Sequence, residues 1–182
     1  MGHILFFDEE KDKDLTIEGL VERIKGAEKM AFKDMKLTDL IYDGQSLTGI
    51  YVVFNEDDKP IYVGKSSSRA ILERIAAHFD LRSIAFMNSY LCALAGKYKG
   101  KKEPQANDAE LKEAYKRALE HKLVFVSIKN CKEYNKIETA LMYFLETGTK
   151  PGLNKIRGKA KYRETDRIIE MRVCNQNKLS IQ

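Results

Sequence analysis

The stretch that decides the fold reads TGIYVVF over residues 48–54 and, after a polar turn, IYVG over residues 61–64. Both runs are rich in valine, isoleucine and tyrosine, which are enriched in β-strands. The segment between them contains NEDD at residues 55–58, a composition typical of a turn. We therefore predict a β-hairpin whose antiparallel pairing brings Tyr51 and Tyr62 close together on one face. Strand preference alone explains two tyrosines here equally well.

Apolar residues recur at helical or strand-like spacing on both sides of this hairpin. A third, central strand is predicted over residues 123–128, where LVFVSI forms an apolar run. Helices are predicted over residues 15–35, 37–42, 71–79, 84–94, 108–121, 134–146 and 166–173. This order of elements favours an α+β fold in which helices pack on a small sheet.

The composition is that of a globular protein with a core of its own. Hydrophobic residues make up 43% of the 182 residues and charged residues 32%, which excludes a wholly disordered chain. Three widely spaced cysteines without a CxxC pair argue against a disulfide scaffold and a structural zinc site. No apolar run approaches the ~20 residues of a membrane span, and acidic residues 8–10 are unlike a secretory signal. We therefore expect a cytoplasmic protein with no membrane partner.

The charge balance permits nucleic-acid binding without demonstrating it. Lysine and arginine total 32 against 27 acidic residues, a formal net charge of +5. The positive charge gathers in residues 97–102 and 150–163. Such runs are usually solvated, but two of them beside one cleft would suit contacts with DNA phosphates. The residues that we assign to DNA binding are Lys97, Lys99, Lys101, Lys102, Lys155, Arg157, Lys159, Lys161 and Arg163.

Arg74 and His78 are neighbours on one side of the helix predicted over residues 71–79, because they are four positions apart. This side borders the apolar stripe of the helix, where a cation and an imidazole could hold an anion such as a phosphate. The alternative is an arginine whose stem packs while its head reaches water, beside a histidine satisfied within the core.

Glu138 lies three and seven positions before Leu141 and Leu145, at the edge of an apolar helix face. A carboxylate there is costly unless it has a partner. A hard divalent cation such as Mg²⁺ is one natural partner, since Mg²⁺ often binds one or two protein carboxylates and keeps its waters. An exposed glutamate at the border of the face is the alternative.

Taken together, these residues resemble one known family. The tripeptides Gly49-Ile50-Tyr51 and Tyr62-Val63-Gly64 resemble the motif of the GIY-YIG nucleases, with valine for isoleucine in the second. An arginine ten positions after Gly64, a histidine four positions later and a glutamate on a downstream helix follow in the family's order. Asn154 completes the pattern, and the resemblance covers residues 48–155.

The resemblance implies a small three-stranded antiparallel sheet flanked by helices. It also implies metal-dependent hydrolysis of DNA phosphodiesters, with Mg²⁺ or Mn²⁺ bound through Glu138 and with 5′-phosphate and 3′-hydroxyl product ends. Around the core, residues 1–47 would form a helical N-terminal extension and residues 81–108 an inserted helix and basic loop. Residues 156–182 would form a basic C-terminal extension. Such additions resemble restriction-type members, although repair and mobile-element nucleases are also candidates.

The resemblance and the needs of phosphodiester hydrolysis suggest how water would be activated. Tyr51 would act as general base, with its pKa lowered by neighbours such as Lys65. Tyr62 would position the water or the phosphate through its hydroxyl group. His78 would orient Tyr51 or serve as a second base.

Three residues would act on the phosphate and the metal ion. Arg74 would bind the non-bridging oxygens through a guanidinium that is forked and always charged. Glu138 would hold the single metal ion, and Asn154 would support the nearby loop or bond a phosphate. Cutting both strands with one site per chain favours a two-fold homodimer.

Two other classes of function remain open. A non-catalytic DNA-binding module would keep the fold and lack the reaction, although every expected catalytic residue type is present. A structural interaction domain would require the whole ordered set of residues to arise by coincidence.

Overall fold

The predicted hairpin forms the middle of the fold. The computed structural model describes residues 2–8, 10–85, 87–97, 105–128, 134–155 and 163–168. β5 (Gly49–Phe54) and β6 (Pro60–Ser66) pair antiparallel, and β7 (Lys122–Ser127) pairs antiparallel with the other edge of β5. The hairpin and the third strand are therefore confirmed.

The sheet is larger than predicted, with five strands and the order β1-β7-β5-β6. β1 (Ile4–Phe6) runs parallel to β7, and β2 (Met30–Ala31) pairs antiparallel with β7. The prediction of a purely antiparallel three-stranded sheet is therefore wrong. Strands of three and two residues are too short to show alternation in the sequence. They form because the outer edge of β7 offers unpaired backbone groups.

The N-terminal region, predicted to be a helical extension, contains a helix and also short strands. α1 (Ile17–Gly26) starts with the Gly19 N–H donating to the Thr16 hydroxyl, a normal helix cap. The predicted helix ends early because the backbone becomes extended at Ala27 and then forms β2. The rest of the region consists of the 3₁₀ helices η1 (Phe32–Asp34) and η2 (Leu37–Leu40) and the two-stranded sheet of β3 (Ile41–Tyr42) with β4 (Gln45–Ser46).

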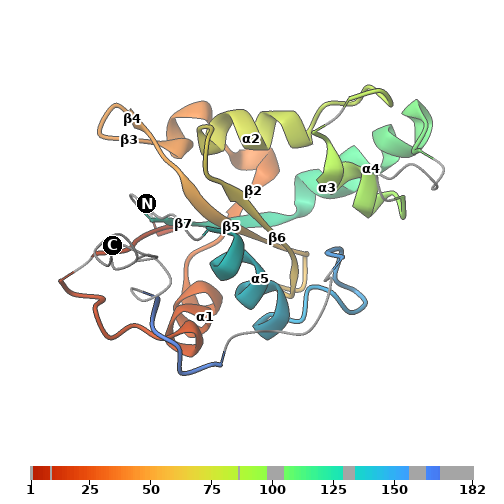
Figure 1. Ribbon diagram of the computed structural model, residues 1–182. Helices are drawn as coiled ribbons and strands as arrows, with labels where there is room; N and C mark the ends of the chain where they lie inside the picture. The colour runs from red at the N-terminus through yellow and green to blue at the C-terminus, as the bar shows by residue number, and fades with distance from the viewer. Residues whose placement is uncertain are drawn as a thin grey trace, which may run out of the picture.

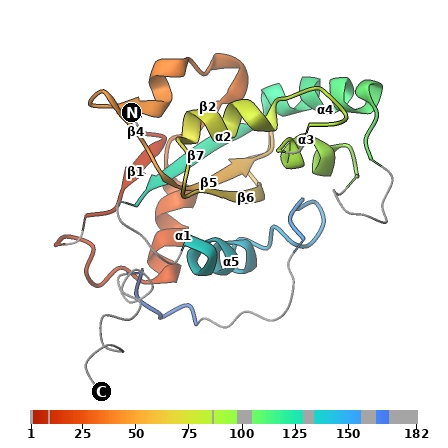
Figure 2. The ribbon, with the colours of Figure 1, turned by 45° about the horizontal axis from the view of Figure 1, so that its top comes forward.

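Helices cover both faces of the main sheet (Figures 1 and 2). α1 and α5 (Tyr134–Phe144) lie on one face. The other face carries α2 (Ile71–His78), α3 (Ser89–Leu94) and α4 (Asp108–Glu120). Described parts of the predicted insertion, residues 81–108, thus supply a helix to one of the two layers.

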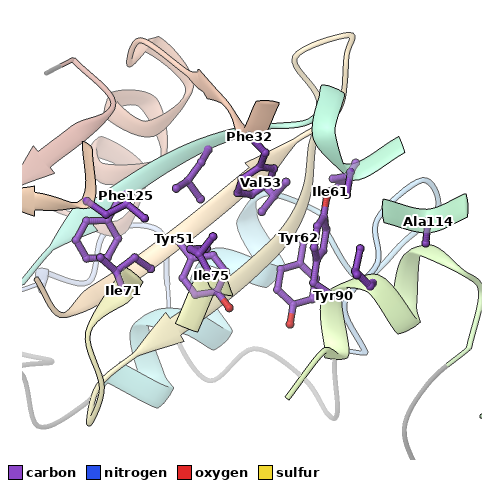
Figure 3. Packing of buried hydrophobic residues seen from close by; sticks show 14 of the residues in the cluster. Phe32, Tyr51, Val53, Ile61, Tyr62, Ile71, Ile75, Tyr90, Ala114 and Phe125 are labelled. Atoms are coloured by element: carbon purple, nitrogen blue, oxygen red, sulfur yellow. The ribbon is translucent and has the colours of Figure 1, made fainter. Parts of the chain in front are cut away.

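Side-chain alternation along β5 divides the core into two clusters. Ile50 and Val52 pack in the cluster with α1 and α5. Tyr51 and Val53 pack in the other cluster, with α2, α3 and α4 (Figure 3). Tyr51 therefore faces the layer of α2, whereas Glu138 comes from α5 in the opposite layer. Any site that uses both must lie at an edge of the sheet where the layers meet.

The described C-terminal residues 163–168 pack against the start of α1. The Ile17 N–H donates to the Asp166 carbonyl at 3.0 Å, and the Ile168 N–H donates to the Leu15 carbonyl at 2.9 Å. Most of the helix predicted over residues 166–173 lies outside the described residues. None of the described helices is long and apolar enough to cross a membrane.

Candidate active site

A pocket of about 230 Å³ lies beside β6, between residues from the two helical layers. α2 contributes Arg74, α5 contributes Glu138, and the end of β6 contributes Lys65. The structure thus brings together three residues predicted from widely separated parts of the sequence. The full lining is Lys65, Ser66, Ser67, Ser68, Arg69, Arg74, Met87 and Glu138.

The carboxylate in this pocket is paired with a lysine. Lys65 Nζ lies 3.0 Å from Glu138 Oε2, and Lys65 also donates to the Asn135 side-chain oxygen. The Glu138 side chain is only 17% exposed. Burial raises the pKa of Glu138, while Lys65 and then Arg74 oppose that rise. A partly desolvated carboxylate of this kind needs a positive partner.

Glu138 is the single acidic side chain among the described residues that line the pocket. The described residues contain no group of three or more histidine, cysteine or acidic side chains placed to hold a metal. A cation at Glu138 would therefore take most of its ligands from water and substrate, which is the usual behaviour of Mg²⁺. In the structure, the positive partner of the Glu138 carboxylate is the Lys65 ammonium group.

Arg74 carries an unsatisfied donor. Its Nε atom is buried and has no hydrogen-bond partner among the described residues. The neighbouring Nη1 donates to the Met87 sulfur at 3.8 Å, and the Arg74 guanidinium also acts on the Tyr51 hydroxyl, whose pKa it lowers in part. An unpaired buried donor costs about 1–3 kcal/mol, more for a charged group. Arg74 also lines the pocket, so its guanidinium is placed to meet an anion there.

Tyr51 is fully buried, is not among the described residues that line the pocket, and pairs with His78. The Tyr51 hydroxyl oxygen lies 2.5 Å from His78 Nε2, and the Tyr51 and Tyr62 rings stack with centroids 6.3 Å apart. Figure 3 shows these two tyrosines side by side with their hydroxyl groups pointing in the same direction. The two phenols and the imidazole therefore form one buried polar cluster inside an apolar layer.

The pKa of Tyr51 is not lowered as expected. Burial raises it well above the usual value and the neighbouring Tyr62 adds to the rise, whereas Arg74 lowers it in part. Lys65, the residue expected to lower it, pairs with Glu138 instead. Burial also raises the pKa of Tyr62, whose hydroxyl lies 3.4 Å from the Ser89 hydroxyl. Both phenols are therefore protonated at neutral pH.

Steric crowding explains why both tripeptides contain a glycine at these positions. A Cβ atom on Gly64 would collide with the Tyr51 phenol, and one on Gly49 would collide with the Val126 carbonyl oxygen of β7. Gly64 faces Tyr51 directly in the register of β5 and β6. The tyrosine ring therefore lies flat over β6 only because position 64 has no side chain.

Asn154 fastens the loop after α5 to β6. Its side-chain oxygen accepts a hydrogen bond from the Val63 N–H at 2.7 Å, and its side-chain nitrogen donates to the Val63 carbonyl at 2.9 Å. The Leu153 N–H donates to the Ile61 carbonyl at 2.7 Å. Both polar atoms of the amide are used, which favours the supporting role over a phosphate contact.

The predicted DNA-binding residues that the structure describes do not line this pocket. Lys97 Nζ lies 3.7 Å from Glu110 of α4, and Arg163 Nε lies 3.4 Å from Asp166. Neither they nor Lys155 are among the described residues that line the pocket. The other predicted contacts, Lys99, Lys101, Lys102, Arg157, Lys159 and Lys161, lie outside the described residues.

Several residues of the site escaped the sequence analysis. Ser66, Ser67, Ser68, Arg69 and Met87 all line the pocket. The serine run directly after the second tripeptide was a usable signal, since serine hydroxyls and backbone N–H groups in a loop suit an oxyanion. Nothing in the sequence pattern marks Met87.

Comparisons of this chain with protein-family models, with curated proteins and with solved structures returned no match.

Proposed function

We propose that this protein is a metal-dependent endonuclease that hydrolyses phosphodiester bonds of DNA. The observation that carries the proposal is the pocket beside β6, where Arg74 with its unpaired buried donor meets the Lys65–Glu138 pair. An anion site and a carboxylate able to hold a cation, within one pocket, suit a phosphodiester and the ion that assists its hydrolysis. The resemblance to GIY-YIG nucleases names the same residues.

Arg74 would bind the phosphate and Glu138 the divalent cation, Mg²⁺ or Mn²⁺. A guanidinium can donate two hydrogen bonds to the phosphoryl oxygens at once, and the transition state strengthens them. Lys65 would give up its ion pair when the cation binds to Glu138. A bound cation supplies charge neutralisation at the phosphate and at the leaving oxygen.

Tyr51 would take the proton of the attacking water, and Tyr62 would hold the water or the phosphate in place. Because Tyr51 is buried and protonated, this route requires that water reaches the phenol and that the phenol first loses its proton. The raised pKa also means that only a small fraction of Tyr51 is ionised at neutral pH. Cleavage by this route would therefore become faster as the pH rises.

A restriction-type arrangement fits this chain best. Residues 2–47 contribute β1, β2 and α1 to the same sheet and core, so they elaborate the catalytic core. Products would carry 5′-phosphate and 3′-hydroxyl ends. A homodimer would bring two such pockets to the two strands of one duplex.

A non-catalytic DNA-binding module of the same fold is the second candidate. Two observations favour it: Tyr51 is buried and protonated, and Glu138 already forms an ion pair with Lys65. A module of this kind would bind phosphates through Arg74 and leave them intact.

Incubation of purified protein with supercoiled plasmid separates the two candidates. The endonuclease predicts nicked and linear DNA with Mg²⁺ or Mn²⁺ and none after chelation with EDTA. A gel-shift assay on the same samples measures binding. Binding at full strength without cleavage under any divalent cation would contradict the endonuclease and favour the module.

A further inference from the structure

His78 contacts the first turn of α3 as well as Tyr51. Its Nδ1 atom lies 3.3 Å from the backbone nitrogen of Tyr90, the second residue of α3. The first N–H groups of a helix have no acceptor within the helix, so they require one from elsewhere. His78 Nδ1 supplies that acceptor. A nitrogen that accepts a hydrogen bond carries no proton of its own.

The proton of the His78 ring must then sit on the other nitrogen. Burial, followed by the charge of Arg74, lowers the pKa of His78 well below its usual value, so the ring is neutral at pH 7. A neutral imidazole has one N–H group, and Nδ1 is already excluded. The remaining Nε2 atom lies 2.5 Å from the Tyr51 hydroxyl oxygen.

We propose that His78 acts on Tyr51 as a fixed hydrogen-bond donor and not as its proton acceptor, with α3 setting the tautomer. The His78 Nε2–H donates to the Tyr51 oxygen, and the Tyr90 N–H holds Nδ1 from the opposite side. His78 and Tyr90 are thus positioning residues. Within the proposed nuclease function, on which this part rests, the donor stabilises an ionised Tyr51.

The same geometry directs the Tyr51 proton elsewhere. With His78 Nε2 donating, the Tyr51 hydroxyl can donate to the Tyr62 hydroxyl, and this contact partly offsets the rise that burial causes in the pKa of Tyr62. Tyr62 in turn contacts the Ser89 hydroxyl at the first residue of α3. The Tyr51 hydroxyl proton therefore lies on the Tyr62 side of the oxygen, away from His78.

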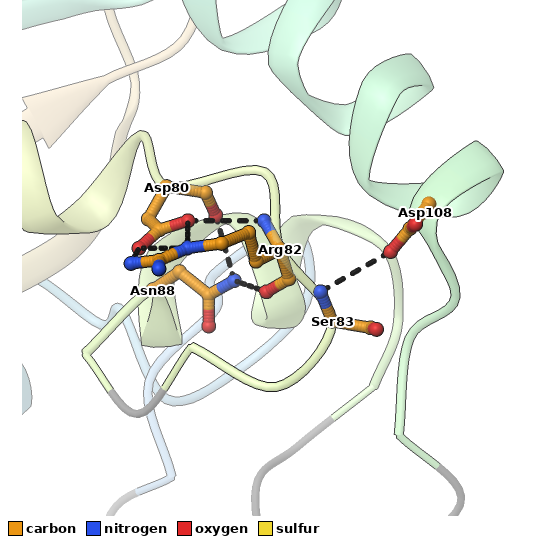
Figure 4. Close-up of polar contacts among 5 residues, drawn as sticks. All are labelled: Asp80, Arg82, Ser83, Asn88 and Asp108. Carbon is orange, nitrogen blue, oxygen red and sulfur yellow. Dashed lines mark hydrogen bonds and ion pairs between the residues drawn. The ribbon is translucent and has the colours of Figure 1, made fainter.

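The start of α3 is anchored well enough to hold this tautomer. The Tyr90 side chain is 1% exposed, and its hydroxyl oxygen lies 2.5 Å from His121 Nδ1. Just before α3, the buried Asn88 side chain donates to the carbonyls of Asp80 and Arg82 at 2.8 and 3.1 Å (Figure 4).

The loop between α2 and α3 is also hydrogen-bonded to α4. The Ser83 N–H donates to the Asp108 carboxylate at 3.2 Å (Figure 4). The connection between α2 and α3 is therefore held at both of its ends, and the Tyr90 N–H stays fixed over His78.

Nitrogen NMR of the full chain tests the tautomer without any activity. The protein has three histidines, and the variant His78→Gln assigns the ring signals of His78 by their loss. At pH 7, ¹⁵N spectra should show His78 with a protonated, pyrrole-type Nε2 and an unprotonated, pyridine-type Nδ1. A protonated Nδ1, in either a neutral or a charged ring, would overturn the proposal.

Cleavage kinetics provide a second test and separate this inference from the function. His78→Gln keeps an N–H donor without a base and should cleave within about tenfold of wild type. His78→Ala removes the donor and should lose about a hundredfold, the usual cost of one donor to a developing oxyanion. Equal, large losses in both folded variants would overturn the donor role. If the wild type does not cleave DNA at all, the nuclease function fails, whereas the NMR spectrum still decides the tautomer.

Discussion

Arg74 is the single residue whose chemistry follows most directly from its surroundings. Its Nε–H is buried without a partner among the described residues, and it lines the pocket that contains Glu138. A lysine at this position would keep the charge but lose the planar fork of donors. The difference between the two side chains therefore measures how much the geometry contributes.

We expect Arg74→Lys to cleave DNA about a hundredfold more slowly at saturating protein. Losing one transition-state contact of ~3 kcal/mol corresponds to about two orders of magnitude in rate. Single-turnover kinetics measure this directly. The matched control is Arg69→Lys, since Arg69 lines the same pocket but is half exposed and paired with Glu73. Equal rates for the two variants would make Arg74 a residue that only attracts DNA.

At this scale the sequence predicted positions better than protonation states. The spacing of Arg74 and Glu138 against apolar stripes placed both at the edges of packed faces, and both line the pocket. The raised pKa of Tyr51 was missed because its largest cause is burial. Burial depends on α2 and α3, which are distant in sequence, so no local pattern reports it.

At the scale of the elements, the β5–β6 hairpin depends on the close approach of the Tyr51 ring to Gly64. A Cβ atom at Gly64 would collide with the Tyr51 ring, and the backbone of a paired strand cannot move away without breaking its hydrogen bonds. The hydroxyl group of Tyr51 is also held by His78. Overpacking at this position therefore has no easy relief.

Gly64→Ala should lower the free energy of unfolding by about 1–3 kcal/mol and slow cleavage, because Tyr51 is pushed from its place. Denaturant unfolding gives the first quantity. Gly26→Ala is the control, since a Cβ atom at the end of α1 meets nothing within 4 Å. Its stability should stay within about 1 kcal/mol of wild type. A Gly64→Ala protein as stable and as active as this control would contradict the steric role.

Whole elements were predicted well where the pattern was long. The helix expected over residues 134–146 is α5, and the one expected over residues 108–121 is α4. The first helix was predicted too long because Ala27, Ala31 and Met35 continue its apolar spacing. In the folded chain Ala31 pairs with Lys122 of β7, so tertiary pairing outweighs the helical pattern.

On the scale of the whole molecule, the pocket exists because two helical layers meet beside β6. Arg74 belongs to the layer that packs with Tyr51, and Glu138 belongs to the layer that packs with Ile50. No single segment contains the site, which is why its lining could not be read in full from the motif. Stability of the fold and integrity of the site are consequently linked.

Because His78 is buried and neutral, the free energy of unfolding should depend on pH. The pKa of His78 lies well below the usual 6.5 in the folded protein. Below pH 6.5 the histidine binds a proton in the unfolded chain but not in the folded chain. The free energy of unfolding therefore falls by up to about 1.4 kcal/mol for each unit by which the pH is lowered. His121 acts in the same direction. Denaturant unfolding between pH 7 and pH 5 should show this loss, and a smaller loss in His78→Gln. Identical slopes would contradict the buried neutral histidine.

The most direct measurement is the single-turnover rate of Mg²⁺-dependent DNA cleavage by Glu138→Gln. Glu113→Gln is the control, since Glu113 is an exposed residue of α4 paired only with Lys116 among the described residues. We predict that Glu138→Gln binds DNA at least as well as wild type, because a negative charge is removed, and cleaves about a hundredfold or more slowly. A Glu138→Gln protein that cleaves as fast as Glu113→Gln would contradict a nuclease site in this pocket.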